Sequence, residues 1–215
     1  MAHAVVTAVD RIRAVRQRTD PGRATLVAIS GIDASGKGYV AELMKRSLGV
    51  GGFSVALLHV DDWLRPLPKQ TENPIEHFYR DGFRFGEMFS TLVLPLRDHG
   101  RVRGRADTLD ATASARRSSR CEFASVDIVL LEGIFLMKRD LLRNYDLSVW
   151  VDCSFATSLR RAVSRRQEGL GPEETVRAYQ TLYFPAQHLH FELDAPRAAA
   201  DLILDNDLDV GGTAP

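Results

Sequence analysis

A short glycine-rich stretch constrains this chain more than any other part of its sequence. Residues 28–43 read AISGIDASGKGYVAEL: an apolar run ends at Ser30, the pattern G-x-x-x-x-G-K spans Gly31 to Lys37, and a helical pattern follows. A glycine-rich turn between a buried strand and a helix directs backbone N–H groups at phosphate oxygens. The stretch therefore predicts a phosphate-binding loop (P-loop, Walker A), with the Lys37 ammonium against the β- and γ-phosphates. An ordinary strand-to-helix turn is the alternative interpretation.

The residue after the lysine departs from the usual pattern. Ser or Thr normally stands there and gives a hydroxyl ligand to Mg²⁺, whereas this chain has Gly38. Phosphate oxygens, water and a carboxylate can still hold Mg²⁺, which keeps several waters in most sites. Two hypotheses stay open: an enzyme with an altered metal site, or a nucleotide-binding protein without turnover. The residues expected to contact the nucleotide are Gly31, Ile32, Asp33, Ala34, Ser35, Gly36, Lys37, Gly38 and Tyr39.

Apolar runs and helical patterns alternate along the chain. Since near-continuous apolar runs are typical of parallel strands buried on both faces, the alternation predicts an α/β fold, with a parallel sheet between two layers of helices. Pro95 is expected to end one helix early, and Pro74 is expected in a loop. The expected strands are residues 24–30, 53–60, 126–133, 147–153 and 200–206, and the expected helices are residues 2–18, 39–48, 85–96, 137–144, 156–168 and 172–190.

Composition narrows the class of protein. Lys and Arg equal Asp and Glu at 28 each, so the net charge of zero disfavours a general nucleic-acid binder. No apolar run reaches the length that spans a bilayer, so no membrane partner is expected. Cys121 and Cys153 lie in unrelated segments without metal-ligand spacing, and residues 1–22 lack the apolar block of a secretory signal. The expected compartment is the cytoplasm.

Acidic residues follow the ends of two further strands. Asp61 and Asp62 come after the second apolar run, and Glu132 lies at the end of the third. Ligands of open parallel sheets bind beyond the carboxyl ends of the strands, where the glycine loop also lies. Phosphoryl transfer to a hydroxyl needs one carboxylate near the acceptor and one near the metal, which these acids can supply. Alternatively, they are solvated acids or helix caps.

The order of these motifs resembles a known family. The segments GIDASGKG, HVDDWLRP, LLEGIFL, an arginine-rich helix and ADLILDN are similar in order and spacing, over residues 24–206, to the uridine kinase/phosphoribulokinase-type group of P-loop kinases. The resemblance implies a P-loop NTPase three-layer sandwich with a five-stranded parallel sheet and an Arg-rich lid. It also implies ATP and Mg²⁺ as cofactors and phosphoryl transfer to a small-molecule hydroxyl.

The resemblance assigns roles to residues of this chain. Asp61 matches the acid that orients and deprotonates the acceptor hydroxyl, beside Lys37 on the phosphates. Glu132 matches the acid near the metal, and Asp62 is the second acid expected there. Arg165 matches a lid arginine that neutralises the transferred phosphoryl group, and the neighbouring Arg161 can share that task.

The same resemblance suggests a division of the chain. Residues 1–22 form an N-terminal helix, residues 23–210 the kinase domain and residues 211–215 a tail. Within the domain, residues 97–122 are expected as an insert or hairpin near the acceptor site, and residues 156–190 as lid helices. Gly86 stands where relatives often carry an acid that holds ribose hydroxyls. The acceptor therefore stays open among a nucleoside, a sugar and a sugar phosphate, and a homo-oligomer is implied.

Overall fold

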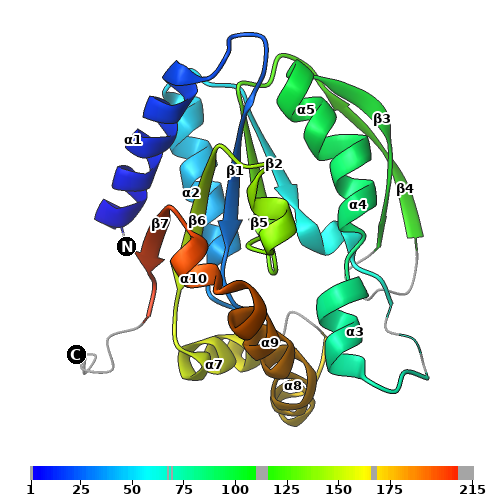
Figure 1. The fold of residues 1–215 in the computed structure, drawn as a ribbon. Helices are drawn as coiled ribbons and strands as arrows, with labels where there is room; N and C mark the ends of the chain where they lie inside the picture. Colours follow the sequence, from blue (N-terminus) through cyan, green and yellow to red (C-terminus); the bar gives the residue numbers. More distant parts are fainter. Residues whose placement is uncertain (1, 67, 69, 110–115, 166–168, 208–215) are drawn as a thin grey trace.

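The structure is a computed structural model that describes residues 2–66, 68, 70–109, 116–165 and 169–207. The expected tail, residues 211–215, lies outside the described residues, as does the Cys121 side chain. Five parallel strands form the central sheet in the order β2-β5-β1-β6-β7 (Figure 1). This confirms the predicted five-stranded parallel sheet. The strands are β1 (Thr25–Ser30), β2 (Val55–His59), β5 (Ile128–Gly133), β6 (Leu147–Asp152) and β7 (Leu202–Asp205).

Helices cover both faces of this sheet, as the three-layer prediction requires (Figure 1). Successive side chains of a strand point to opposite faces, so Leu26 and Ala28 of β1 belong to one core and Val27 and Ile29 to the other. The helices are α1 (Ala2–Arg18), α2 (Lys37–Val50), α3 (Pro74–Asp81), α4 (Phe85–Met88), α5 (Leu94–His99), α6 (Arg139–Leu142), α7 (Phe155–Arg165), α8 (Pro172–Ala178), α9 (Phe184–Asp194) and α10 (Pro196–Ala199).

Two proline predictions are wrong for local physical reasons. Pro95 does not end its helix, because a π-helical turn at Phe89–Val93 widens the backbone just before it and α5 continues to His99. Pro74 is not in a loop but at the first turn of α3, where its missing N–H costs nothing. Asn73 caps that helix by accepting a hydrogen bond from the Glu76 N–H at 3.1 Å.

A two-stranded antiparallel hairpin lies outside the main sheet. Its strands are β3 (Val102–Leu109) and β4 (Arg116–Phe123), within the arginine-rich segment. Val102 pairs with Phe123 at the base of the hairpin, and both pack against the core under α4 and α5. The hairpin is therefore anchored at its base to the domain.

A buried polar network joins α3 to α9. The Tyr79 hydroxyl and the His190 Nδ1–H both donate to Asp194 Oδ2, the latter at 2.7 Å, and the Arg139 backbone N–H donates to Oδ1 at 3.1 Å. Burial by itself raises the pKa of Asp194, but these hydrogen bonds outweigh it and lower the pKa to about 2. The network therefore depends on an ionised carboxylate.

We expect Asp194→Asn to lower the free energy of unfolding by about 2–4 kcal/mol at pH 7, because the amide cannot accept from all three donors. The folded-state pKa of Asp194 lies below its ordinary value of 3.8, so its contribution is complete above about pH 4 and is lost as the pH falls towards 2. Urea unfolding at pH 7 and pH 3 measures both effects. Asp10→Asn, at an exposed ion pair, is the control, with an expected change within about 0.5 kcal/mol.

Candidate active site

The carboxyl edge of the sheet brings three sequence segments together. Strand β1 lies beside β5, with Ser30 opposite Gly133, and β5 lies beside β2, with His59 opposite Glu132. The loop after Ser30, the acids after His59 and the Glu132 side chain therefore leave neighbouring strands at one edge. The opposite arrangement, with the acids on the far side of the molecule, would have excluded a phosphoryl-transfer site.

The loop from Gly31 to Lys37 has the backbone of a tight, inward-facing turn. Ala34 and Gly36 have φ values of 54° and 92°, and α2 begins at Lys37 directly afterwards. A Cβ at Gly36 would overlap the Asn206 side-chain nitrogen, so only glycine fits there. Lys37 Nζ donates to the Ile32 carbonyl oxygen at 3.5 Å, which places the ammonium over the loop.

Two side chains from the carboxyl-terminal half hold the outer edge of the loop. Arg161 Nη1 and Asn206 Nδ2 both donate to the Ser35 carbonyl oxygen, at 3.0 and 2.7 Å, and Arg161 Nη2 donates to the Asn206 carbonyl oxygen at 2.7 Å. Arg161, predicted to contact the nucleotide, thus commits two of its donors to the backbone. Asn206 was not predicted as a site residue; it ends the last expected strand and directly follows β7.

Two further side chains hold the loop at Asp33. Ser158 Oγ in α7 donates to the Asp33 carbonyl oxygen at 2.6 Å, and Gln187 Nε2 in α9 donates to Asp33 Oδ2 at 3.0 Å. Gln187 is fully buried, so α9 fixes the loop from the interior. Sequence reasoning missed both residues, because no local pattern links them to a loop more than a hundred positions away.

Asp61 is the acid whose ionisation the site perturbs most. Part of the residue faces solvent, while its carboxyl group is enclosed by protein close to the loop and to other ionised groups. Desolvation is the largest effect and raises the pKa of Asp61 to about 6, even though the Lys37 ammonium opposes it. The remaining groups that act on the pKa of Asp61 are Glu132, Asp33 and His59. A carboxylate poised near neutrality is suited to accept a proton.

Asp62 is exposed, and its pKa is raised by desolvation, with the charges of His59 and Glu132 acting in opposite directions. It therefore lies at the exposed rim of the group that Asp61 and Glu132 form.

A metal site made of protein side chains alone is not present in the described ranges. These ranges leave out 67, 69, 110–115, 166–168 and the ends, and within them no three His, Cys, Asp or Glu side chains group together. Mg²⁺ in nucleotide sites takes most of its ligands from phosphates and water, so a single buried carboxylate is an adequate protein ligand.

Glu132 has the geometry for that role. The residue is 6% exposed, and its Oε1 accepts a hydrogen bond from His59 Nδ1 at 2.8 Å. Its Oε2 is buried and has no hydrogen-bond partner among the described residues. A Cβ at Gly38 would lie 3.8 Å from both carboxylate oxygens. The carboxylate thus faces the position where ordinary loops carry the metal-binding hydroxyl.

The other predicted residues lie around this centre. Tyr39 is 65% exposed on the first turn of α2, and Arg165 is exposed at the last described residue of α7. Ile32 is buried in the core, so only its backbone faces the loop interior. These roles stay predictions, since the geometry places the side chains without testing them.

The aromatic cluster near the acids is mainly core. Phe78, Tyr79 and Phe83 are each at most 6% exposed, and Phe78 contacts Phe83 and Phe135 with ring centroids 5.8 Å apart. The neighbouring Phe85 is partly exposed. These aromatic side chains therefore contribute mainly to the hydrophobic core.

Arg84 is a buried cation beside this cluster. Its guanidinium lies 4.9 Å from the centre of the Trp63 ring and donates to Glu87 Oε1 at 2.9 Å. Trp63 is the last residue of the short helical turn that carries Asp61. The Arg84–Trp63 pair therefore adjoins the acids of this turn.

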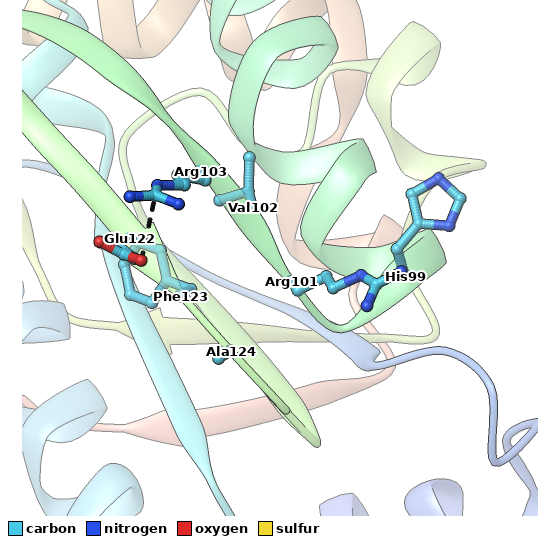
Figure 2. Close-up of a pocket in the computed structure, with 7 residues that line it drawn as sticks. All are labelled: His99, Arg101, Val102, Arg103, Glu122, Phe123 and Ala124. Atoms are coloured by element: carbon cyan, nitrogen blue, oxygen red, sulfur yellow. Dashed lines mark ion pairs between the residues drawn. The ribbon is translucent and has the colours of Figure 1, made fainter.

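A cavity of about 480 Å³ lies at the base of the hairpin (Figure 2). Its lining includes His99, Arg101 and an Arg103–Glu122 ion pair. The preceding Arg97 accepts a backbone hydrogen bond from Ala24, just before β1, so this cavity is at the amino edge of the sheet. It is separate from the phosphate-binding loop at the carboxyl edge.

Comparisons with known proteins agree with this geometry. A uridine kinase of Staphylococcus haemolyticus is 28% identical over 186 residues, which cover 84% of this chain and 86% of that protein. A uridine kinase of Macrococcus caseolyticus is 26% identical and covers 85% of this chain and 88% of its own length. The chain is thus similar, over most of its length, to the uridine kinase/phosphoribulokinase-type P-loop kinases. Its activity class is that of a small-molecule kinase.

Solved structures show the same fold for this kinase. A possible uridine kinase from Bacillus stearothermophilus superposes with a TM-score of 0.69 at 18% identity, over 91% of this chain and 98% of that one. A D-glycerate 3-kinase from Cryptococcus neoformans gives 0.62 at 11% identity, over 98% of both chains. No protein-family model matches the kinase. No helix in its described part is both long and apolar enough to cross a bilayer.

Proposed function

We propose that this kinase transfers the γ-phosphoryl group of ATP to a hydroxyl of a nucleoside or a sugar-type small molecule, with Mg²⁺ as cofactor. The observation that carries the proposal is the convergence of the loop ammonium of Lys37, the perturbed carboxylate of Asp61 and the buried carboxylate of Glu132 at one edge of the sheet. A nucleotide binder without turnover has no need for an acid with a pKa of about 6 beside its phosphates.

In the proposed reaction, Asp61 accepts a hydrogen bond from the acceptor hydroxyl and takes its proton as the oxygen attacks the γ-phosphorus. Lys37 and the N–H groups of the loop hold the phosphate oxygens, and the bond from the γ-phosphorus to the bridging oxygen of ADP breaks. When bound, Mg²⁺ would neutralise charge on the phosphates, and Glu132 and Asp62 are the acids that would hold it. Arg165 lies on the helix that would bring a guanidinium over the transferred group.

Two observations bear on the acceptor. Curated relatives are named uridine kinases, and a structural neighbour is a D-glycerate 3-kinase, so both nucleosides and small hydroxy acids belong among the candidates. Gly86, which replaces an acid expected to hold ribose hydroxyls, faces open space. The buried Arg84 instead offers a cation near Asp61. We therefore give anionic, sugar-type acceptors the same rank as nucleosides.

The deciding experiment is acceptor-dependent release of ADP. Purified enzyme with ATP and Mg²⁺ is screened against nucleosides, sugars, sugar phosphates, D-glycerate and pantothenate, with product confirmed by mass spectrometry. We expect one chemical class to raise ADP release well above the background hydrolysis rate. Tight ATP binding with no acceptor-dependent release for any class would instead support the non-catalytic alternative raised by Gly38.

The pH profile provides a separate prediction. Because Asp61 must be ionised to take the proton and its pKa is about 6, kcat/KM for the acceptor should rise with pH, reach half of its maximum near pH 6 and level off above about pH 7. Initial rates at saturating ATP and Mg²⁺ between pH 5 and 8.5 measure this rise of kcat/KM with pH. A profile that is flat across this range would show that Asp61 is not the base.

A further inference from the structure

The unusual Gly38 and the buried Glu132 form a single arrangement. Ordinary loops of this type place a hydroxyl at position 38, whereas here the Glu132 carboxylate faces that position, with both oxygens 3.8 Å from where a Cβ would be. The Glu132 Oε2 is buried without a hydrogen-bond partner among the described residues. A buried carboxylate oxygen without a partner is costly in a folded protein, and a bound cation would supply the missing partner.

His59 decides which oxygen of Glu132 stays available. Its Nδ1–H donates to Oε1 at 2.8 Å and holds that oxygen in a hydrogen bond. The His59 ring is itself partly exposed, with a side-chain exposure of 43%, so it holds the acid from the outer side. The carboxylate is therefore fixed with one oxygen bound and the other free.

The nearby hydroxyl of Ser35 is not placed to replace the missing ligand. Ser35 Oγ lies 2.6 Å from the position of a Cβ at Gly31, which would also contact the Val151 carbonyl oxygen of β6. In the sheet order, β6 lies on the opposite side of β1 from β5, which carries Glu132. Ser35 Oγ thus lies beside Gly31, at the start of the loop, whereas Glu132 faces Gly38 at its end.

We propose that Glu132 Oε2 binds the divalent cation directly in place of the absent hydroxyl, and that His59 is the positioning residue that makes this possible. The inference rests on the proposed ATP·Mg²⁺ site and specifies how the metal is held there. His59 acts through Glu132 and does not touch the metal. Outer-sphere partners of this kind typically change metal affinity by about 10- to 100-fold when they are removed.

Mn²⁺ binding to the enzyme saturated with a non-hydrolysable ATP analogue tests this proposal, with free Mn²⁺ followed by electron paramagnetic resonance. We expect His59→Leu to weaken Mn²⁺ binding about tenfold or more and Glu132→Gln to weaken it further. His59→Asn is the conservative variant, because its Nδ2–H can reach Glu132 from nearly the same place as the ring Nδ1–H; it should stay within about threefold of the parent enzyme.

Position 38 provides the decisive comparison. Gly38→Ser restores a hydroxyl beside the carboxylate, so the double variant Gly38→Ser/His59→Leu should recover most of the Mn²⁺ affinity that His59→Leu loses. If His59→Leu binds Mn²⁺ as the parent does, or if Gly38→Ser gives no recovery, the proposal is wrong. Affinity for the ATP analogue in EDTA is measured in parallel. Absence of analogue binding by the parent enzyme with Mn²⁺ present would refute the nucleotide site itself, and affinity in EDTA equal to that of the parent shows that the variants are folded.

Discussion

Replacing Asp61 with asparagine is expected to lower kcat by about 10²- to 10⁴-fold, with a much smaller change in the affinity for ATP. The amide keeps the size of the side chain but cannot take a proton from the acceptor, and general-base catalysis typically contributes a factor of this size. Acceptor-dependent ADP release at saturating Mg²⁺ measures kcat, and titration with a non-hydrolysable analogue measures ATP affinity. A variant with parental kcat would remove Asp61 from the mechanism.

Asp62→Asn is the matched control for this experiment. Asp62 has the same chemistry one position along the chain but lies at the metal side of the proposed site, so its replacement should raise the Mg²⁺ concentration needed for activity. The maximal rate at saturating Mg²⁺ should fall much less than it does for Asp61→Asn. Equal losses in the two variants at saturating Mg²⁺ would contradict the separate roles.

Asp61→Asn should also stabilise the fold at neutral pH. The folded state raises the pKa of Asp61 from 3.8 to about 6, so the folded protein binds this proton more tightly than the unfolded chain does. Ionisation of Asp61 therefore costs stability as the pH rises through this interval, and the amide avoids that cost. We expect the Tm to rise at pH 8 and to change little at pH 4. Lower activity with higher stability is the combination typical of a functional residue.

Gly36→Ala is expected to weaken binding of the ATP analogue by roughly 5- to 30-fold. The φ of 92° is unfavourable for alanine by about 1–2 kcal/mol, and the added Cβ would overlap the Asn206 side chain that holds the loop. The loop of the variant would rearrange to relieve this strain, and binding would have to restore the strained conformation. Since 1.4 kcal/mol corresponds to a tenfold change in affinity, this free energy accounts for the expected loss of affinity. Isothermal titration calorimetry measures it directly.

Gly52→Ala separates backbone strain from a direct effect on the loop. Gly52 also has a positive φ, 87°, but lies in the exposed turn between α2 and β2, with nothing within 4 Å of an added Cβ. Its replacement should lower the Tm to a similar extent and leave ATP-analogue affinity unchanged. If Gly36→Ala binds the analogue as tightly as Gly52→Ala does, the loop from Gly31 to Lys37 is not the nucleotide site.

The sequence by itself determined the elements and the edge at which the site lies. Apolar runs predicted all five strands, because burial on both faces is a property of consecutive residues. Parallel strands end at one edge, so the glycine loop, Asp61 and Glu132 were predicted together there. The start of α3 was also encoded locally, by Asn73 and Pro74, and was misread because proline was taken only as a helix breaker.

Only the tertiary structure decided which side chains meet. The order β2-β5-β1 brings His59 to Glu132 and leaves Oε2 facing Gly38, and nothing local to any of the three segments specifies that order. The same holds for Asn206 and Gln187, which hold the loop from positions more than 150 residues away. Periodicity and capping act over a few residues, whereas hydrogen bonds between distant segments depend on how the whole domain packs. Core formation by the aromatic side chains was decided in the same way, because burial depends on the neighbours that folding brings together.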